Sequence, residues 1–168
     1  KKIIADLSKV GKGEILLQKN LNDLQKEISV LIENSKGVPT KLIEITSKIG
    51  SGATPKGGEG VYKETGISFI RSQNVYDGFF KEEGLAFIDE GQAQKLDNVA
   101  VEQNDILFNI TGASIARCCI VEDKFLPARV NQHVSIIRAN EKVLPKYLQL
   151  VITSSEYKNQ LLEIGEGA

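Results

Sequence analysis

Two short polar segments carry side chains that can hydrogen-bond to nucleic acid. The first, Arg71-Ser72-Gln73-Asn74, directly follows an apolar run, and the second, Asn109–Ser114, contains Thr111 and has Arg117 just beyond it. Arginine, glutamine and asparagine can each make two hydrogen bonds to the edge of guanine or adenine. Both segments also have an ordinary structural interpretation, because a surface arginine often pairs with a carboxylate and an asparagine after a strand often stabilises a turn.

A third segment, Ile49–Gly58, is a glycine-rich loop suited to holding one DNA phosphate. Its backbone N–H groups, the hydroxyls of Ser51 and Thr54 and the ammonium group of Lys56 could bind a phosphate without reading sequence. The loop does not match the nucleotide-binding fingerprints, because Pro55 stands where a dinucleotide site needs glycine and the Gly-Lys-Ser/Thr of a Walker loop is missing. A tight structural turn is the alternative.

Residues suited to catalysis or metal binding are sparse. His133 is the sole histidine, and Cys118 and Cys119 would face opposite sides of a strand. No cluster has the spacing of metal ligands, no Pro-Pro dipeptide offers the signature of an amino-methyltransferase, and the carboxylates are scattered. We therefore predict a binding protein with no catalytic residue and no metal site. His133 is expected to be a hydrogen-bonded structural residue beside Asn131 and Gln132, with a Cys–His dyad as the weaker alternative.

Length and composition point to one ordinary domain with a helical appendage. The 168 residues are 41% hydrophobic and 26% charged, which argues against disorder and fibrous repeats. No apolar run approaches the roughly 20 residues that cross a bilayer, and no signal sequence opens the chain. Because adjacent cysteines make a poor disulfide framework, we expect a cytoplasmic location. A chain that starts at Lys1 and contains no methionine is expected to be part of a longer protein.

The charge is unevenly distributed along the chain. A formal net charge of −1 does not by itself indicate a nucleic-acid partner. From Lys36 to Arg71, however, six basic residues stand against three acidic ones, a local sum of +3, whereas from Asp77 to Asp105 eight acidic residues stand against two basic ones, a local sum of −6. One face of the molecule could therefore be positive.

Residues 1–37 carry a narrow apolar seam that predicts a helix of coiled-coil type. Its members alternate in steps of four and three, with one omission at Glu14: Ile3, Leu7, Val10, Leu17, Leu21, Leu24, Ile28 and Leu31. The pattern predicts a helix over Glu14–Glu33, a less regular extension over Ile3–Val10 and a stop at Asn34–Gly37 before Pro39. Such a seam needs a partner helix, although a helix packed on its own domain is the alternative. We place the domain boundary after residue 37.

Residues 38–168 have the pattern of a β-rich body with peripheral helices. Strands are predicted at 66–71, 105–110, 116–121 and 134–138, a short helix at Asp89–Leu96, and helices from Pro145 and around Tyr157, while 40–49 is ambiguous. The predicted fold class is α+β, a mixed β-rich globular domain plus one long N-terminal helix.

The order of these segments resembles the target recognition domain of type I restriction-modification specificity (S) subunits. The matching blocks are Gly50–Pro55, Ile67–Asn74, Asp105–Cys118, Asn131–Val134, and Pro145–Tyr147 followed by Gly165–Ala168. The likeness covers 38–168, and residues 1–37 resemble the spacer helix that precedes such a domain. It implies sequence-specific recognition of one half of a bipartite DNA target on behalf of a methyltransferase and endonuclease complex.

The resemblance also implies partners and cofactors. The expected partners are double-stranded DNA, methyltransferase (modification) subunits, a restriction/translocase subunit, and a second recognition domain or a second copy through the helix, with no membrane. S-adenosylmethionine, ATP and Mg²⁺ are expected on the partner subunits and none on this chain. The competing hypothesis is a noncatalytic protein-interaction adaptor that assembles a complex through its coiled-coil helix.

The residues predicted to contact DNA are polar or basic side chains of the glycine-rich loop, of the loop 56–64 and of the two polar segments. They are Ser51, Thr54, Lys56, Lys63, Arg71, Gln73, Asn74, Thr111 and Arg117. The blocks that carry the resemblance are shared by proteins that read different DNA, so they are expected to build the scaffold or hold phosphates. Base selection is expected from the loops 56–64, 75–84 and 122–129.

Overall fold

The chain divides into two compact units, Lys1–Gly37 and Val38–Ala168. The structure, a computed structural model, describes residues 23, 26–27, 30–31, 34 and 37–166. In the first unit the described residues up to Leu31 are helical, and the Asn34 side-chain amide donates to the Val30 carbonyl oxygen at 2.7 Å. Of the predicted seam only Leu31 is described, and the remaining length of the predicted helix, with its coiled-coil packing, lies outside the described residues.

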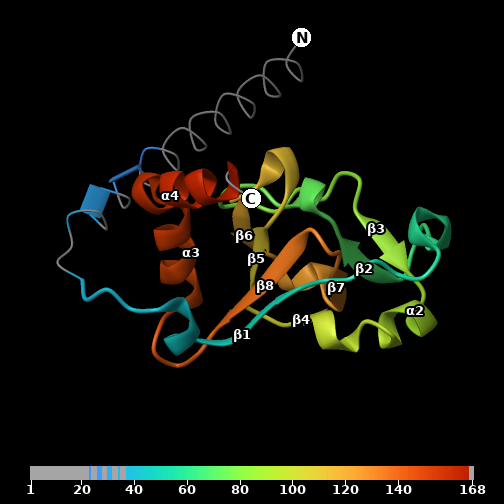
Figure 1. Cartoon of the computed structure of the whole chain (residues 1–168). Coiled ribbons are helices and arrows are strands. Elements are labelled where there is room, and N and C mark those ends of the chain that lie inside the picture. Colours follow the sequence, from blue (N-terminus) through green and yellow to red (C-terminus); the bar gives the residue numbers. More distant parts are fainter. Residues whose placement is uncertain (1–22, 24–25, 28–29, 32–33, 35–36, 167–168) are drawn as a thin grey trace, which may run out of the picture. The chain divides into compact units, whose positions relative to one another are not determined.

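The second unit is built on two four-stranded sheets (Figure 1). The first sheet is antiparallel in the order β1 (Thr46–Ser51), β8 (Val134–Ala139), β5 (Ile106–Asn109) and β6 (Cys118–Ile120). The second has the order β3 (Ala86–Ile88), β2 (Ile67–Ile70), β7 (Ala128–Val130) and β4 (Ala100–Val101), with β2 and β7 parallel. With helices α2 (Glu90–Gln94), α3 (Pro145–Thr153) and α4 (Ser155–Glu166), the unit confirms the predicted α+β class.

The inner strands of the first sheet are covered on both faces, and their alternating side chains enter two different apolar clusters. Leu107 of β5 and Cys119 of β6 belong to the main core, together with Phe69 and Val130 of the second sheet. Their neighbours Ile106 and Cys118 point the other way, into a second cluster. The two cysteines therefore face opposite sides of a strand, as predicted.

Helix α3 supplies the cover for the outer face of the first sheet. Pro145 occupies the first turn, where its missing N–H is not needed and its fixed φ favours the helix. Leu148 and Ile152 lie four residues apart, so they share one helix face, and both pack in the second cluster. Among the described residues, no helix is long and apolar enough to cross a membrane.

The acidic stretch from Asp77 to Asp105, in which only the short helix Asp89–Leu96 was predicted, also contains β3 and β4. These strands and β7 are only two or three residues long, too short to show alternation, and they form by pairing with β2 or with each other. The ambiguous segment 40–49 resolves into a 3₁₀ turn, Leu42–Glu44, followed by most of β1.

Gly52 is a position where the fold leaves no space for a side chain. It follows β1, and a Cβ atom there would lie 2.0 Å from the Val130 carbonyl oxygen, whereas a Cβ at Gly50 would meet nothing within 4 Å. We expect Gly52→Ala to lower the free energy of unfolding by about 3 kcal/mol, because the backbone of β7 must move. Gly50→Ala should change it by less than about 0.5 kcal/mol. Urea denaturation measures both, and equal effects would contradict this account.

Both cysteines are expected to be chemically inert in the folded chain. Each is fully buried. Burial raises the pKa of the Cys119 thiol to about 12 and that of Cys118 still further, so neither forms the reactive thiolate at mildly alkaline pH. Iodoacetamide should leave the native chain unmodified and should add two adducts in concentrated urea, as read by mass spectrometry. Modification of the native chain would show that the first sheet opens.

Candidate nucleic-acid interface

The two polar segments predicted from sequence meet at one open groove of about 400 Å³. Its walls are formed by the turns after β2 and β5, by the residue that precedes β6 and by the residue that precedes β8. In chain order the lining residues are Ser72, Gln73, Tyr76, Thr111, Gly112, Ala113, Ser114, Arg117 and His133. The described residues that line it include hydroxyl, amide, imidazole and guanidinium groups but no carboxylate. The groove is therefore suited to a ligand rich in hydrogen-bond acceptors and negative charge.

A buried asparagine holds the two walls together. Asn109, the last residue of β5, is fully buried, and its side-chain amide donates to the Ser72 carbonyl oxygen at 2.9 Å. A longer contact of 3.5 Å joins the same amide to the Val75 carbonyl oxygen. The end of a central strand thus fixes the position of the turn that follows β2.

Arg117 differs from the other three arginines of the sequence in its partners. Arg71, Arg129 and Arg138 each pair with a carboxylate, for Arg138 the buried Asp105 at 2.8 Å. Across the described part of the chain, no carboxylate lies within ion-pair distance of Arg117. Its guanidinium carbon instead lies 4.6 Å from the centre of the Tyr76 ring, a cation–π contact that orients the group and leaves its N–H donors for a ligand.

A chain of hydrogen bonds runs from the glycine-rich loop to the groove. The Thr54 hydroxyl donates to Gln132 Oε1, Gln132 Nε2 lies 3.0 Å from His133 Nε2, and His133 Nδ1 lies 2.6 Å from the Thr111 hydroxyl. The backbone N–H of His133 donates to Asn131 Oδ1 at 3.1 Å. Because the Gln132 amide donates to Nε2, the imidazole carries its proton on Nδ1 and donates to Thr111. The structural role predicted for His133 is confirmed, and through it Thr111 is fixed in the wall.

The prediction that Asn74 contacts DNA is wrong. Asn74 is fully buried, its Oδ1 accepts from the Arg71 backbone N–H at 3.1 Å, and its amide donates to the Lys81 carbonyl oxygen at 2.9 Å. It therefore closes the base of the loop 75–84. Its neighbour Gln73 is exposed and lines the groove.

Arg71 is committed to internal contacts. Its guanidinium donates to the Gly84 carbonyl oxygen at 2.8 Å, pairs with Glu59 at 3.4 Å and lies 5.3 Å from the centre of the Tyr62 ring. In this conformation the residue holds together two loops predicted to select bases, 56–64 and 75–84. A direct DNA contact by Arg71 is not needed to explain its environment.

The remaining predicted residues do not line the groove. Ser51 ends β1, Lys56 lies in the turn after it, and Lys63 forms a single bridge with Phe87. Tyr76 and His133 line the groove although they lie outside the two polar segments and were not among the residues predicted to contact DNA. Tyr76 falls in a loop already predicted to select bases, but its pairing with Arg117 depends on tertiary structure.

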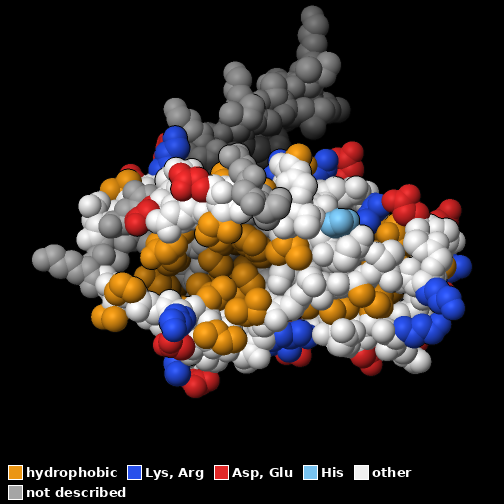
Figure 2. Space-filling view, viewed as in Figure 1, with side chains coloured by type: hydrophobic (Ala, Val, Ile, Leu, Met, Phe, Trp, Pro, Cys, Tyr) orange, Lys and Arg blue, Asp and Glu red, His pale blue; other side chains and the backbone are white. Residues whose placement is uncertain are grey.

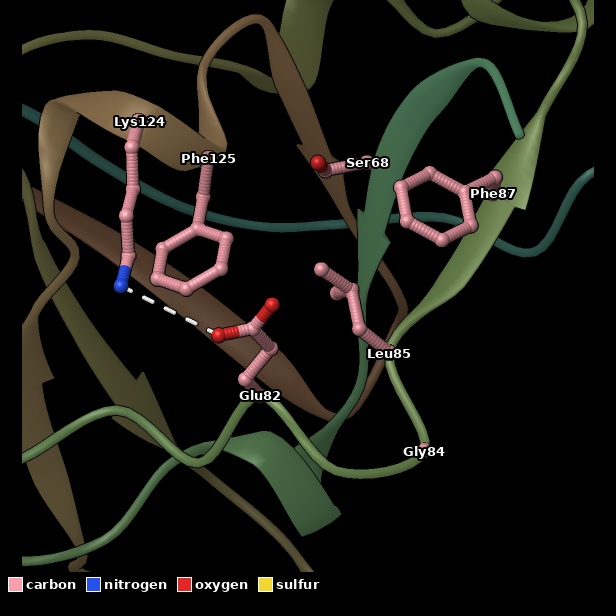
Figure 3. Close-up of a pocket in the computed structure, with 7 residues that line it drawn as sticks. All are labelled: Ser68, Glu82, Gly84, Leu85, Phe87, Lys124 and Phe125. Atoms are coloured by element: carbon pink, nitrogen blue, oxygen red, sulfur yellow. Dashed lines mark ion pairs between the residues drawn. The ribbon is translucent and has the colours of Figure 1, made fainter. Parts of the chain in front are cut away.

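A second hollow of about 370 Å³ lies between the loops 75–84 and 122–129 (Figure 3). Phe87, Phe125 and Leu85 give it apolar walls, and Lys124 pairs with Glu82 at 3.9 Å across its mouth. The carboxylate makes this hollow a poorer place for a phosphate than the groove around Arg117. The fold does bring these two predicted loops side by side.

The surface offers no single basic patch on the face shown in Figure 2. Lys and Arg side chains there are scattered among Asp and Glu, and a broad apolar area lies beside α3. Among the described residues, no group of three or more His, Cys, Asp or Glu side chains could hold a metal ion. The groove, with its local excess of donors, is the best-formed polar site.

Two solved structures have a fold similar to that of this chain. A chain from a study of the structural basis underlying complex assembly and conformational transition of the type I R-M system matches with a TM-score of 0.55, 14% identity, and coverage of 98% of this chain and 42% of that one. The HsdS subunit from Thermoanaerobacter tengcongensis matches with a TM-score of 0.54, 12% identity, and coverage of 96% and 40%. This chain folds like HsdS.

The likeness confirms, at the level of fold, the resemblance to type I S subunits expected from the sequence blocks. The chain spans about two fifths of the length of these HsdS-like structures. No family model matches the sequence, and no curated protein matches it.

Asn74 and Gln73 allow a direct test of which side chain is structural. Asn74→Ala should lower the free energy of unfolding by about 2 kcal/mol, because it strips buried backbone groups of their partners. Gln73→Ala, at the exposed neighbour, should change it by less than about 0.5 kcal/mol. Thermal and urea unfolding report both values. A stability loss at Gln73 as large as at Asn74 would reverse the assignment.

Proposed function

We propose that this chain recognises a short sequence of double-stranded DNA through the groove around Arg117, as one recognition half of a type I restriction-modification specificity subunit. The observation that carries the proposal is the state of Arg117, which lies without a carboxylate partner among the described residues and against Tyr76 in a groove lined by donors. The HsdS-like fold gives this groove its context.

The groove has the chemistry of direct base readout. A guanidinium group held by an aromatic ring can donate two parallel hydrogen bonds to O6 and N7 of guanine, and the Gln73 amide can pair with adenine in the same way. The hydroxyls of Thr111 and Ser114 can bind phosphate or base edges. Each two-point base contact adds about 1–3 kcal/mol of discrimination.

The role proposed for the whole chain is noncatalytic. It reads one half of a bipartite target and directs modification and restriction/translocase subunits, which bind S-adenosylmethionine, ATP and Mg²⁺. A length of about two fifths of the compared chains fits one recognition half plus its spacer segment. The division into a spacer at 1–37 and a recognition domain at 38–168, pairing through the spacer and a cytoplasmic location belong to the same proposal.

The experiment is a binding-site selection from random duplex DNA followed by titration of the chosen duplex at fixed salt. Arg117→Ala should weaken binding by about 1–3 kcal/mol and relax the preference at one position if Arg117 reads a base. If it holds a phosphate, binding should weaken equally for all sequences and the slope of log affinity against log salt should fall by about 1.

Lys95→Ala, at the exposed C-terminal end of α2, is the matched loss of one positive charge away from the groove. It should leave the base preference unchanged. A chain that binds matched and scrambled duplexes equally, or binds neither, would favour the adaptor hypothesis over DNA recognition.

A further inference from the structure

A tight turn beside the groove holds one phenylalanine outward. Val75 pairs with Phe80 in a single antiparallel bridge, the Tyr76 N–H donates to the Phe79 carbonyl oxygen at 3.2 Å, and Gly78 takes a positive φ of 82°. Phe80 packs inward, with its ring 4.6 Å from that of Phe125. Phe79 faces the other way and is 55% exposed.

The turn is anchored at both of its middle residues. The Gly78 N–H donates to the Cys118 carbonyl oxygen of β6 at 2.9 Å, and the Asp77 carboxylate pairs with Lys158 of α4. The Phe79 ring stacks on Tyr76 at 5.0 Å with an angle of 22° between the planes. An exposed apolar ring is thus held in one place before any ligand arrives, which lowers the entropy lost on binding.

The surroundings of this ring fit a nucleic acid better than an apolar protein surface. The Tyr76 ring on which it stacks also carries Arg117 at 4.6 Å and Lys81 at 5.9 Å. The nearby carboxylate of Asp77 is neutralised by Lys158, and Lys81 also pairs with Glu83 at 2.9 Å. An apolar group beside the Arg117 guanidinium, which has no carboxylate partner among the described residues, matches the major-groove edge of an A·T pair, where the 5-methyl group of thymine lies beside hydrogen-bonding atoms.

We propose that Phe79 contacts the 5-methyl group of a thymine in the DNA target and so helps to determine its sequence. The inference rests on the proposed function and assigns one base class to one side chain of the loop 75–84. Arg117 and Gln73 would read neighbouring polar edges, while Phe79 senses an apolar group that carries no hydrogen bond.

Deoxyuridine separates this contact from every other property of thymine, because it differs only by the missing methyl group. In the duplex chosen by site selection, each thymine is replaced singly by deoxyuridine, and binding of the chain is measured by fluorescence anisotropy. One replacement should weaken binding roughly fourfold, the value of one buried methyl group. The same replacement should have no effect on Phe79→Ala, and Phe79→Leu should keep part of the discrimination.

Leu144→Ala, a substitution of another apolar residue that is 75% exposed, is the control and should discriminate thymine from deoxyuridine as the unaltered chain does. Unaltered thermal unfolding of Phe79→Ala would show that the variant is folded. Two outcomes overturn the inference and leave the proposed function intact. In the first, the chain prefers a sequence, but every deoxyuridine replacement changes its affinity by the same factor as that of the Phe79→Ala variant. In the second, the chosen duplex lacks thymine. Absence of any sequence preference would overturn both.

Discussion

The groove around Arg117 depends on one hydrogen bond donated by a fully buried side chain. The Asn109 amide donates to the Ser72 carbonyl oxygen, so the end of β5 and the turn after β2 are held at one distance although they belong to different sheets. A buried amide without such a partner would carry a desolvation penalty of about 1–3 kcal/mol, which favours the closed arrangement. The groove is for this reason a rigid property of the fold.

Burial of β5 on both of its faces determines the position of Asn109. Leu107 and Ile106 anchor β5 in separate apolar clusters, one shared with the second sheet and one covered by α3. A slip of one residue along the strand would turn both side chains to the wrong cluster and would carry Asn109 away from Ser72. Apolar packing thus sets the register, and the register sets the polar site.

Short apolar runs bounded by turn-forming residues allowed the main strands β2, β5, β6 and β8 to be predicted, and helical spacing of apolar residues allowed the helices from Pro145 to be predicted, because each is a local pattern. The short strands β3, β4 and β7 could not be predicted, since they exist only through partners distant in sequence, as in the parallel pairing of Ser68 with Ala128. The polar segments themselves were predicted, but their meeting was not. Nor does sequence reveal that Arg71 is engaged and Arg117 is available, because that depends on where Glu59 lies in space.

The ion pair between Asp77 and Lys158 connects the turn that bears Phe79 to α4. Its side chains are 25% and 41% exposed, on Lys158 and Asp77 respectively, so solvent limits its strength to about 1 kcal/mol. Thermodynamic linkage is reciprocal, so a ligand that bound at α4 and one that bound at the turn would alter each other's affinity through this pair by no more than about fivefold. A limit of about fivefold is too small for this contact alone to act as an on–off switch between α4 and the turn.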